Sequence, residues 1–450
     1  MALFYLVHAG TTLNQVTQAG VGTALTLPTG VTLSTDASRR PRMAVMGSYV
    51  IVANSPSETL LSDPDGTVRI LAIKPPSTAP VLSATGSGVL TGAYQVKTTF
   101  LVRDDFGNTI SETPFGPTSA SSASLASQIL LAEQVPLSSQ TISARRLYRT
   151  LTGPGTVFFP WIDLDGNVQT SVQDDLADAS LDNVAAPTTL GLPPARMPLL
   201  AKWRGRLWAQ DHNTLDDVTF TEEGSFSQWA SNRLTIPPKG FDIRGITGFV
   251  ARREALGVGK TNVLYQITGT SSDNFRVVKV SDQIGIEAPE SVVVYRDTAY
   301  FLWKDGVYEW DSGGIRCISD GKVRSWFTTD TYFNRSRFEN AFATIDPIKN
   351  KYRLHLANAG DSTENRWVEY DLVDKTWWGP HQRDDVTPTS AFLLYDANDV
   401  ALPCMGNSTG FIWKDQATRT DGAATAIDAD AMGKFHDMGT PDIEKYFGEL

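Results

Sequence analysis

Cysteine and histidine are scarce in this sequence of 450 residues, which has two cysteines and five histidines. Cys317 and Cys404 cannot supply a disulfide framework or a four-cysteine zinc site. We expect both to be buried thiols of a protein from a reducing compartment. The sequence also lacks any apolar run near the roughly 18 residues that a membrane-spanning helix requires, since Ala44–Ala53 is about the longest. No membrane partner is therefore predicted.

A cationic excess is also missing. Lys and Arg total 39 and Asp and Glu total 50, so the net charge is −11. Phosphate neutralisation dominates DNA affinity, so this balance disfavours sequence-reading DNA binding, although DNA could still pass nearby. The apolar N-terminus, Met1–Val7, is short and has no basic flank, so no signal peptide is predicted. Hydrophobic residues make up 41%, which excludes wholesale disorder.

Short β-like runs separated by turns are what the sequence does contain. Ser291–Ile318 has four runs rich in β-branched and aromatic residues, and turn residues such as Asp305-Gly306 divide them. The connections are too short for parallel crossovers. This segment is predicted to be an antiparallel four-stranded meander.

Similar units recur along the chain at a spacing of roughly 40–50 residues. We predict an all-β chain with a β-propeller of about six four-stranded blades, because closing the ring hides the terminal sheet edges. A chain of unrelated β-sandwiches is the alternative. The predicted units lie within residues 43–70, 199–221, 246–280, 291–318, 340–378 and 390–414.

One stretch interrupts this rhythm. Residues 80–195 contain about seven short predicted strands, among them Gly92–Arg103 and Ser143–Thr150, which suggests an inserted immunoglobulin- or fibronectin-like sandwich. Ser119–Ser127 is rich in Ser and Ala and is predicted to be a mobile loop. The propeller would then comprise residues 1–76 and 196–450, the latter with further C-terminal strands beginning near Lys434 and Lys445.

Motifs for phosphate and metal binding are weak. Gly257-Val-Gly259-Lys260-Thr261 resembles the end of a phosphate-binding loop, but Glu254 stands where the motif needs glycine, so we expect a hairpin turn. No histidine lies three to five residues from another, so no metal site is predicted. His355 alternates with leucines and is expected to face outward from a strand. The histidines are His8, His212, His355, His381 and His436.

Signatures of catalysis are weak too. Ser319–Trp326 is the nearest stretch to a sialidase Asp box, and its spacing is wrong. The Trp377-Trp378 pair could stack on a sugar, but tryptophans in blade strands more often pack between blades. No Gly-x-Ser-x-Gly nucleophile elbow occurs. We therefore predict no enzyme, no catalytic residue and no cofactor.

Basic residues occur in three short clusters, which we expect to be surface charge or to make salt bridges between subunits. A DNA-backbone contact by the first cluster is the alternative. The clusters are Arg39-Arg40-Pro41-Arg42, Arg145-Arg146 and Arg252-Arg253.

Several runs resemble a known family. They are Trp203-Arg-Gly-Arg-Leu-Trp208, Val263–Gly269, Phe275–Ser281, Ile284–Val293 and Ala299–Trp310. This succession is similar to the propeller of bacteriophage tail hub or nozzle proteins, which include the packaged-DNA stabilisation proteins of short-tailed phages. Arg146-Leu-Tyr-Arg-Thr150 likewise resembles a fibronectin-like domain of phage virion proteins.

The resemblance implies a structural protein of the virion tail, made in the host cytoplasm. It implies a six-fold ring below the portal and adaptor proteins, contacts with tail fibres or tail-tip proteins, and a lumen that retains DNA and guides its ejection without reading its sequence. The family has no catalytic residues to transfer, and the interface residues stay unknown. A glycan- or fibre-binding propeller and, further off, a glycosidase are the alternatives.

Overall fold

The computed structural model describes residues 4–17, 21–36, 41–53, 58–153, 155–182, 184–229, 232–237, 244–382, 388–396, 398–407, 412–414, 420–421 and 425–426. This part of the chain is almost entirely β, and all paired strands within its sheets are antiparallel. None of its helices has the length and apolar character needed to cross a membrane. Its one α-helix, α1 (Arg324–Thr328), and three 3-10 helices, η2 (Asp178–Ser180), η3 (Pro289–Ser291) and η4 (Arg335–Asn340), are short.

Five of the four-stranded sheets pair their strands in chain order, as consecutive hairpins. The first is β4 (Arg42–Met46), β5 (Tyr49–Ala53), β6 (Leu60–Ser62) and β7 (Val68–Ile70). The second is β15 (Leu200–Trp203), β16 (Arg206–Gln210), β17 (Asp217–Phe220) and β18 (Arg233–Thr235). The third is β19 (Ile246–Ala251), β20 (Leu256–Lys260), β21 (Leu264–Thr268) and β22 (Arg276–Ser281). The fourth is β23 (Val293–Tyr295), β24 (Thr298–Trp303), β25 (Gly306–Asp311) and β26 (Gly314–Cys317), and the fifth is β27 (Phe342–Asp346), β28 (Lys351–Leu356), β29 (Arg366–Asp371) and β30 (Trp377–Gln382).

Three smaller sheets complete this part of the fold. One is β31 (Pro388–Tyr395), β32 (Ala401–Asn407) and β33 (Ile412–Lys414), which fits the sixth predicted unit. Another is β1 (Phe4–Ala9), β2 (Thr12–Thr17) and β3 (Gly22–Ala24), a sheet that was not predicted. A two-stranded ribbon of β34 (Thr420–Asp421) and β35 (Thr425–Ala426) follows. The predicted strands near Lys434 and Lys445 lie outside the described residues.

Hydrophobic cores lie between successive sheets, and this arrangement identifies the propeller. Trp208 of the second sheet shares a core with Val258 of the third. Val250 of the third shares another with Phe301 of the fourth, and the fourth and fifth sheets meet around Phe327. Because each blade buries its faces only against its neighbours, the ring is the stable unit. The chain is an all-β protein with a β-propeller, as predicted.

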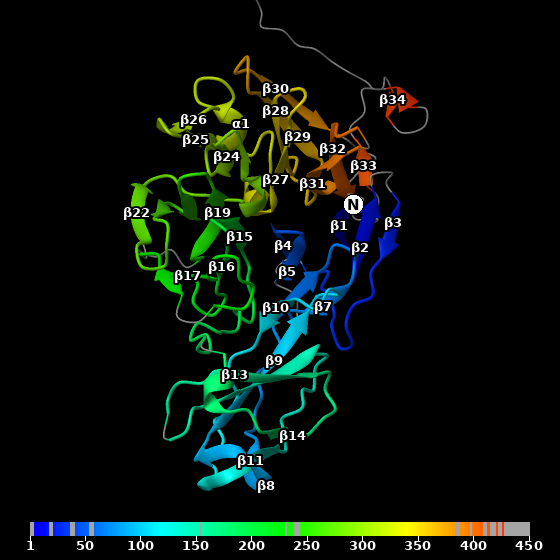
Figure 1. Cartoon of the computed structure of the whole chain (residues 1–450). Coiled ribbons are helices and arrows are strands. Elements are labelled where there is room, and N and C mark those ends of the chain that lie inside the picture. The colour runs from blue at the N-terminus through cyan, green and yellow to red at the C-terminus, as the bar shows by residue number, and fades with distance from the viewer. Residues whose placement is uncertain are drawn as a thin grey trace, which may run out of the picture.

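The unpredicted sheet β1–β3 lies between the last blade and the first. Leu13 of β2 packs with Val52 and Leu60 of the first blade, and the Tyr5 hydroxyl of β1 donates to the carbonyl oxygen of Tyr395 in β31. Figure 1 shows this blue sheet beside the orange strands β31–β33. The N-terminal segment therefore helps to close the ring.

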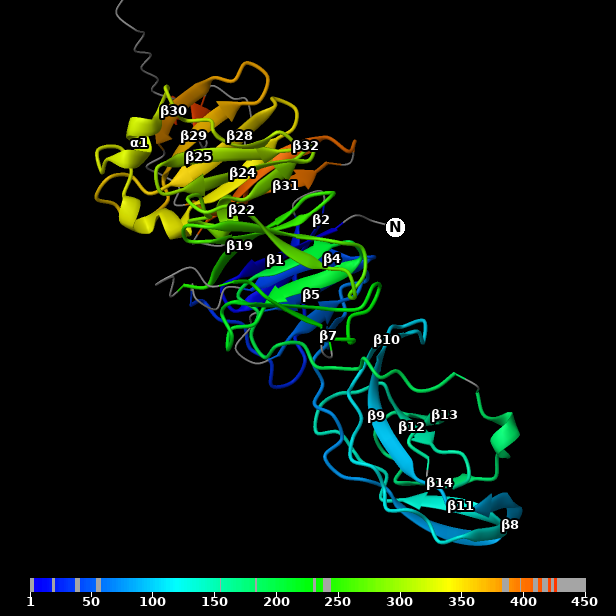
Figure 2. The same ribbon diagram turned by 90° about the vertical axis from the view of Figure 1, so that its left-hand side faces the viewer.

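Two further sheets form a unit that projects from the propeller, as Figure 2 shows. Both contribute to one core, in which Leu90 and Leu130 of one sheet meet Val96 and Leu147 of the other. The unit is a two-sheet sandwich inserted between the first and second blades, and its immunoglobulin-like character and the boundaries 80–195 stay predictions. One sheet has the order β10 (Thr109–Glu112), β9 (Val96–Arg103), β12 (Ala144–Arg149), β13 (Phe159–Asp165), and the other β14 (Ser171–Asp174), β11 (Leu125–Glu133), β8 (Val81–Gly92).

Two local predictions in this sandwich need correction. The predicted strand Gly92–Arg103 is present as β9 but begins at Val96, because residues 93–95 separate it from β8. Ser119–Ser127 is no mobile loop, because its backbone is bonded along the start of β9: the Ser119 and Ser122 amides donate to the carbonyls of Val96 and Tyr94 at 2.9 Å each. Both serine side chains are buried and accept hydrogen bonds from the same strand region. Small residues here permit close packing and do not indicate mobility.

Candidate functional site

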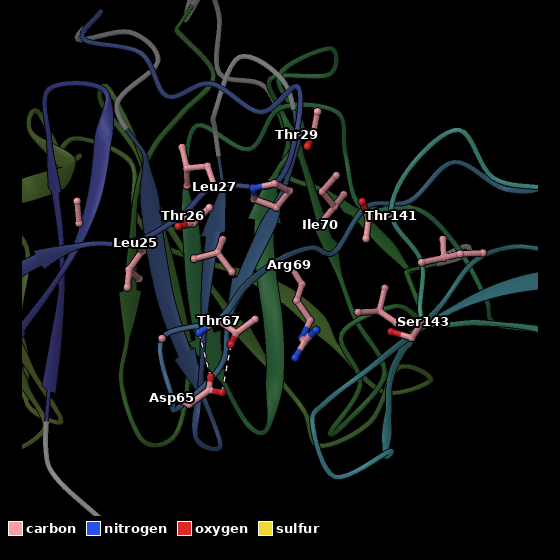
Figure 3. A pocket seen from close by; sticks show the side chains of 16 residues that line it. Leu25, Thr26, Leu27, Thr29, Asp65, Thr67, Arg69, Ile70, Thr141 and Ser143 are labelled. Atoms are coloured by element: carbon pink, nitrogen blue, oxygen red, sulfur yellow. Dashed lines mark hydrogen bonds between the residues drawn. The ribbon is translucent and has the colours of Figure 1, made fainter. Parts of the chain in front are cut away.

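The joint between the propeller and the sandwich contains a cavity. It holds about 700 Å³ and is open to solvent on one side. Residues 24–29 after β3, the β6–β7 turn and β7, and residues 141–143 before β12 form its walls, as Figure 3 shows. Its polar side chains include Asp65, Thr67 and Arg69. Val102 of β9 completes the lining, so the cavity brings together four segments that are separate in the sequence.

An apolar core holds this joint. Phe100 and Val102 of β9 pack with Val68 and Ile70 of β7. Because β9 also belongs to the sandwich core through Val96, the two units share a continuous strand across the joint. The sandwich is therefore packed against the first blade over a shared hydrophobic surface.

Polar contacts lie beside that core. The Tyr49 hydroxyl of β5 donates to Asp104 Oδ2 in the β9–β10 turn at 3.0 Å. Burial, with this hydrogen bond to the carboxylate, raises the pKa of Tyr49 to about 12. Arg69 pairs with Asp63 on its own hairpin and with Asp105 across the joint, at 2.9 and 2.6 Å. Two of these contacts, Tyr49 with Asp104 and Arg69 with Asp105, join the first blade to the sandwich.

The second cavity lies at one end of the propeller, where the first strands of several blades converge. It holds about 650 Å³, and its lining includes Arg42 of β4, Thr247 of β19 and Glu290 of η3. Arg244 Nη1 lies 2.8 Å from Glu287 and 3.5 Å from Glu339, and Arg42 pairs with Glu290. Arginines and carboxylates both line the cavity, so the lining has no single dominant sign.

The predicted turn at Gly257–Thr261 was wrong in its position. Gly257, Gly259 and Lys260 lie inside strand β20, and the turn follows at Thr261. A Cβ on Gly257 would lie 2.4 Å from the Trp310 ring, so glycine is needed for close packing between blades. Lys260 is fully buried and pairs with Asp216 at 2.6 Å. The lysine is thus committed to an ion pair between the third blade and the second.

The prediction for His355 was also wrong. This side chain is 1% exposed and stacks between two cross-strand neighbours, Phe342 at 4.9 Å and Trp367 at 6.0 Å between ring centroids. His381 continues the stack on Trp367 at 5.1 Å. Alternation with leucine does not indicate an outward-facing residue here, because both faces of β28 are buried. His212 lines the second cavity, and His436 lies outside the described residues.

The two neighbouring tryptophans of β30 differ in burial and contacts. Trp377 packs beside the core of the fourth and fifth blades, as the packing interpretation predicts. Trp378 is 54% exposed, and the Lys351 ammonium lies 5.3 Å from its ring centroid. The segment Ser319–Trp326 has a buried serine and leads into α1.

The basic clusters are less exposed than predicted. Arg145 is fully buried and donates to the carbonyl oxygens of Gly166 and Gln169. Arg146 pairs with Asp163 at 2.7 Å, and Arg252, 8% exposed, donates to the carbonyl of Asp297. These three arginines make contacts within the chain, which corrects the expectation of surface charge. Arg253 is 85% exposed, and Arg39 and Arg40 lie outside the described residues.

Both cysteines were predicted to be buried thiols, and this is confirmed for Cys404 only. Cys404 is buried, whereas Cys317 is half-buried and lies 3.3 Å from the Ser319 hydroxyl.

The sequence analysis singled out Arg42 and His212, which line the second cavity, but no sequence signal pointed to the ion pairs of either cavity. Arg69 and Asp105 are 36 positions apart, and Arg244 and Glu287 are 43 apart. Each pair is joined only by the packing of separate hairpins. The β6–β7 turn, Asp63-Pro-Asp65-Gly-Thr67, could have been noted as a carboxylate-rich hairpin, but its partner on β9–β10 could not.

No family model and no curated protein matches the sequence. Among solved structures, a chain of the mitotic checkpoint complex has a TM-score of 0.36 and 10% identity over 86% of this chain and 90% of that one. PorZ, a surface component of the type-IX secretion system of Porphyromonas gingivalis, has a TM-score of 0.31 and 10% identity over 91% and 64%. The WD40 β-propeller domain of Doa1 has a TM-score of 0.31 and 9% identity over 84% and 91%. At these TM-scores the likenesses carry no argument about function.

Proposed function

We propose that this chain is a structural protein of a bacteriophage tail, a hub or nozzle subunit that assembles into a six-fold ring around the DNA channel. The supporting observation is where the family-like runs lie. Trp203 and Trp208 frame the β15–β16 hairpin and are buried in a core between blades. The run Ala299–Trp310 likewise forms the β24–β25 hairpin. The resemblance therefore rests on the parts that build the propeller.

The shape of the molecule supports the same role. A closed ring of antiparallel sheets is stiff, and its loops project at both ends as docking surfaces. The sandwich is packed on the first blade through Phe100 and Val102, so it can present a second surface in a defined direction. Cyclic symmetry would then multiply a modest contact into a stable ring. Portal or adaptor proteins on one side and tail-tip or fibre proteins on the other are the proposed partners.

In this proposal the DNA channel is the central opening of the six-subunit ring, which we call the lumen. Attraction of many phosphates would slow ejection, so the lumen should be neutral or acidic. The net charge of −11 is compatible with that. A continuous stripe of Lys and Arg along the lumen would contradict it.

Mass photometry of the full chain, alone and with a portal-type partner, tests the proposal. A six-fold assembly supports it. A stable monomer whose melting temperature rises with a host glycan would instead favour a glycan-binding module, and polysaccharide hydrolysis abolished by single carboxylate substitutions would favour a glycosidase.

A further inference from the structure

Three aspartates from two different units meet at the joint. Asp63 and Asp65 belong to the β6–β7 hairpin of the first blade, and Asp105 belongs to the β9–β10 hairpin of the sandwich. One carboxylate oxygen from each lies within 4.8 Å of the others. Asp65 also lines the solvent-accessible cavity of Figure 3, so an ion or water can reach the group.

The described residues do not balance the charge at this point. Arg69 is the cation that pairs with the group, through Asp63 and Asp105. Three carboxylates and one guanidinium leave a formal charge of −2. Carboxylates this close repel one another unless a proton or a cation lies between them. A single divalent cation would neutralise the group.

A second observation, separate from the clustering, concerns Asp63. Its side chain is 3% exposed, and its Oδ2 accepts from Arg69 Nε. The other oxygen, Oδ1, is buried and has no hydrogen-bond partner among the described residues. A buried carboxylate oxygen without a donor is costly, and a coordinated cation removes that cost.

We infer that Asp63, Asp65 and Asp105 form a binding site for a hard divalent cation, with calcium preferred, which clamps the sandwich to the first blade. All three ligands are carboxylate oxygens, which suit calcium or magnesium, whereas zinc prefers nitrogen and sulfur. Calcium tolerates irregular geometry and completes its six to eight ligands with water, which the cavity can supply. The inference does not rest on the proposed function.

The test measures calcium binding to the full chain by melting temperature and by Tb³⁺ luminescence. Tyr49 bonds to Asp104, next to Asp105, so it can sensitise bound Tb³⁺. At a hundredfold excess of Ca²⁺ over its Kd, we expect the melting temperature to rise by about 3 °C relative to EDTA. Magnesium at the same concentration should give a smaller rise.

Three substitutions locate the ion. Asp105→Asn should weaken Ca²⁺ binding by about tenfold or more, because it removes a charged ligand from an exposed turn. Asp320→Asn is the matched control, since Asp320 is also an exposed aspartate paired with an arginine, Arg324, at 3.1 Å. It should leave binding unchanged. Arg69→Gln should tighten Ca²⁺ binding, because it removes the competing cation.

Two results would overturn the inference. One is the absence of both a calcium-dependent melting shift and Tb³⁺ emission in the unsubstituted chain. The other is an equal response in Asp105→Asn and Asp320→Asn, since the ion would then bind elsewhere. If Arg69→Gln lowers the melting temperature and calcium does not restore it, Arg69 is the permanent cation of the joint and the site is likewise refuted.

Discussion

Tyr5 and Tyr395 lie 390 positions apart and join the two ends of the propeller ring. The Tyr5 hydroxyl donates to the Tyr395 carbonyl oxygen at 3.1 Å, and the Tyr395 amide donates back to the same hydroxyl. One side chain of β1 thus serves as both donor and acceptor for the last blade. This pairing gives the unpredicted sheet β1–β3 a role in ring closure.

Removing that hydroxyl tests the closure. Tyr5→Phe keeps the aromatic side chain and deletes both hydrogen bonds. We therefore expect a loss of about 1 kcal/mol in the free energy of unfolding, or about 2 kcal/mol at most. Urea unfolding of the full chain measures it. Tyr332→Phe, at a tyrosine that is 38% exposed, is the control and should change little. Equal losses in the two variants would argue against a closing role for Tyr5.

The core between the second and third blades should be the most sensitive to truncation. Trp208 is fully buried and stacks on Phe220 at 4.4 Å between ring centroids. Trp208→Ala should cost about 3–5 kcal/mol, because the cavity cannot be refilled from the sheet. Trp378→Ala removes the same side chain from a site that is 54% exposed and should cost far less. Chemical denaturation of both variants compares them directly.

Glycine is required at the close approach between the third and fourth blades. In Gly257→Ala the new methyl group would lie 2.4 Å from the Trp310 ring. We expect a destabilisation of about 1–3 kcal/mol from overpacking. Gly22→Ala is the control, because its new methyl group would meet nothing closer than 3.9 Å. A Gly257→Ala protein as stable as Gly22→Ala would show that the blades are not packed as described.

The sequence patterns predicted the blades better than they predicted the faces of those blades. Runs such as Ala299–Trp303 and Val307–Trp310 alternate with turn residues, so strand positions and hairpin order follow from local chemistry. His355 was misplaced because a blade strand is buried on both sides, and period-two alternation then no longer separates inside from outside. Gly257 was misplaced because glycine marks a close approach as well as a turn.

Sheet β1–β3 and the joint were beyond sequence reasoning for another reason. Their roles depend on contacts between distant segments, such as Tyr5 with Tyr395 and Arg69 with Asp105. No local spacing encodes those contacts. Arginines such as Arg145 were misjudged similarly, since burial against loop carbonyls replaces a counter-ion.

Acid should weaken the fifth blade through Glu369. Burial tends to raise the pKa of this carboxyl, but the attraction of Arg353 and the hydrogen bond from Lys351 prevail and lower it to about 2. Since the folded pKa lies below the ordinary value of 4.5, the stabilisation is complete above pH 4.5 and is lost as the pH falls towards 2. The shift corresponds to on the order of 3 kcal/mol.

Unfolding measured between pH 5 and pH 2 checks this expectation. Glu369→Gln should be less stable than the unsubstituted chain at pH 5, because it removes the carboxylate that pairs with the buried Arg353 guanidinium. The difference should shrink as the pH approaches 2. Glu254→Gln, at a glutamate whose side chain is 75% exposed, should run parallel to the unsubstituted chain throughout.

Imaging of the assembled protein shows whether six copies form a ring. Electron microscopy can be applied to the full chain with a portal-type partner, or to a virion that contains it. We expect six copies in a ring around the DNA channel. Isolated monomers with a glycan bound in the second cavity, and no six-fold ring in any particle, would contradict the proposed function.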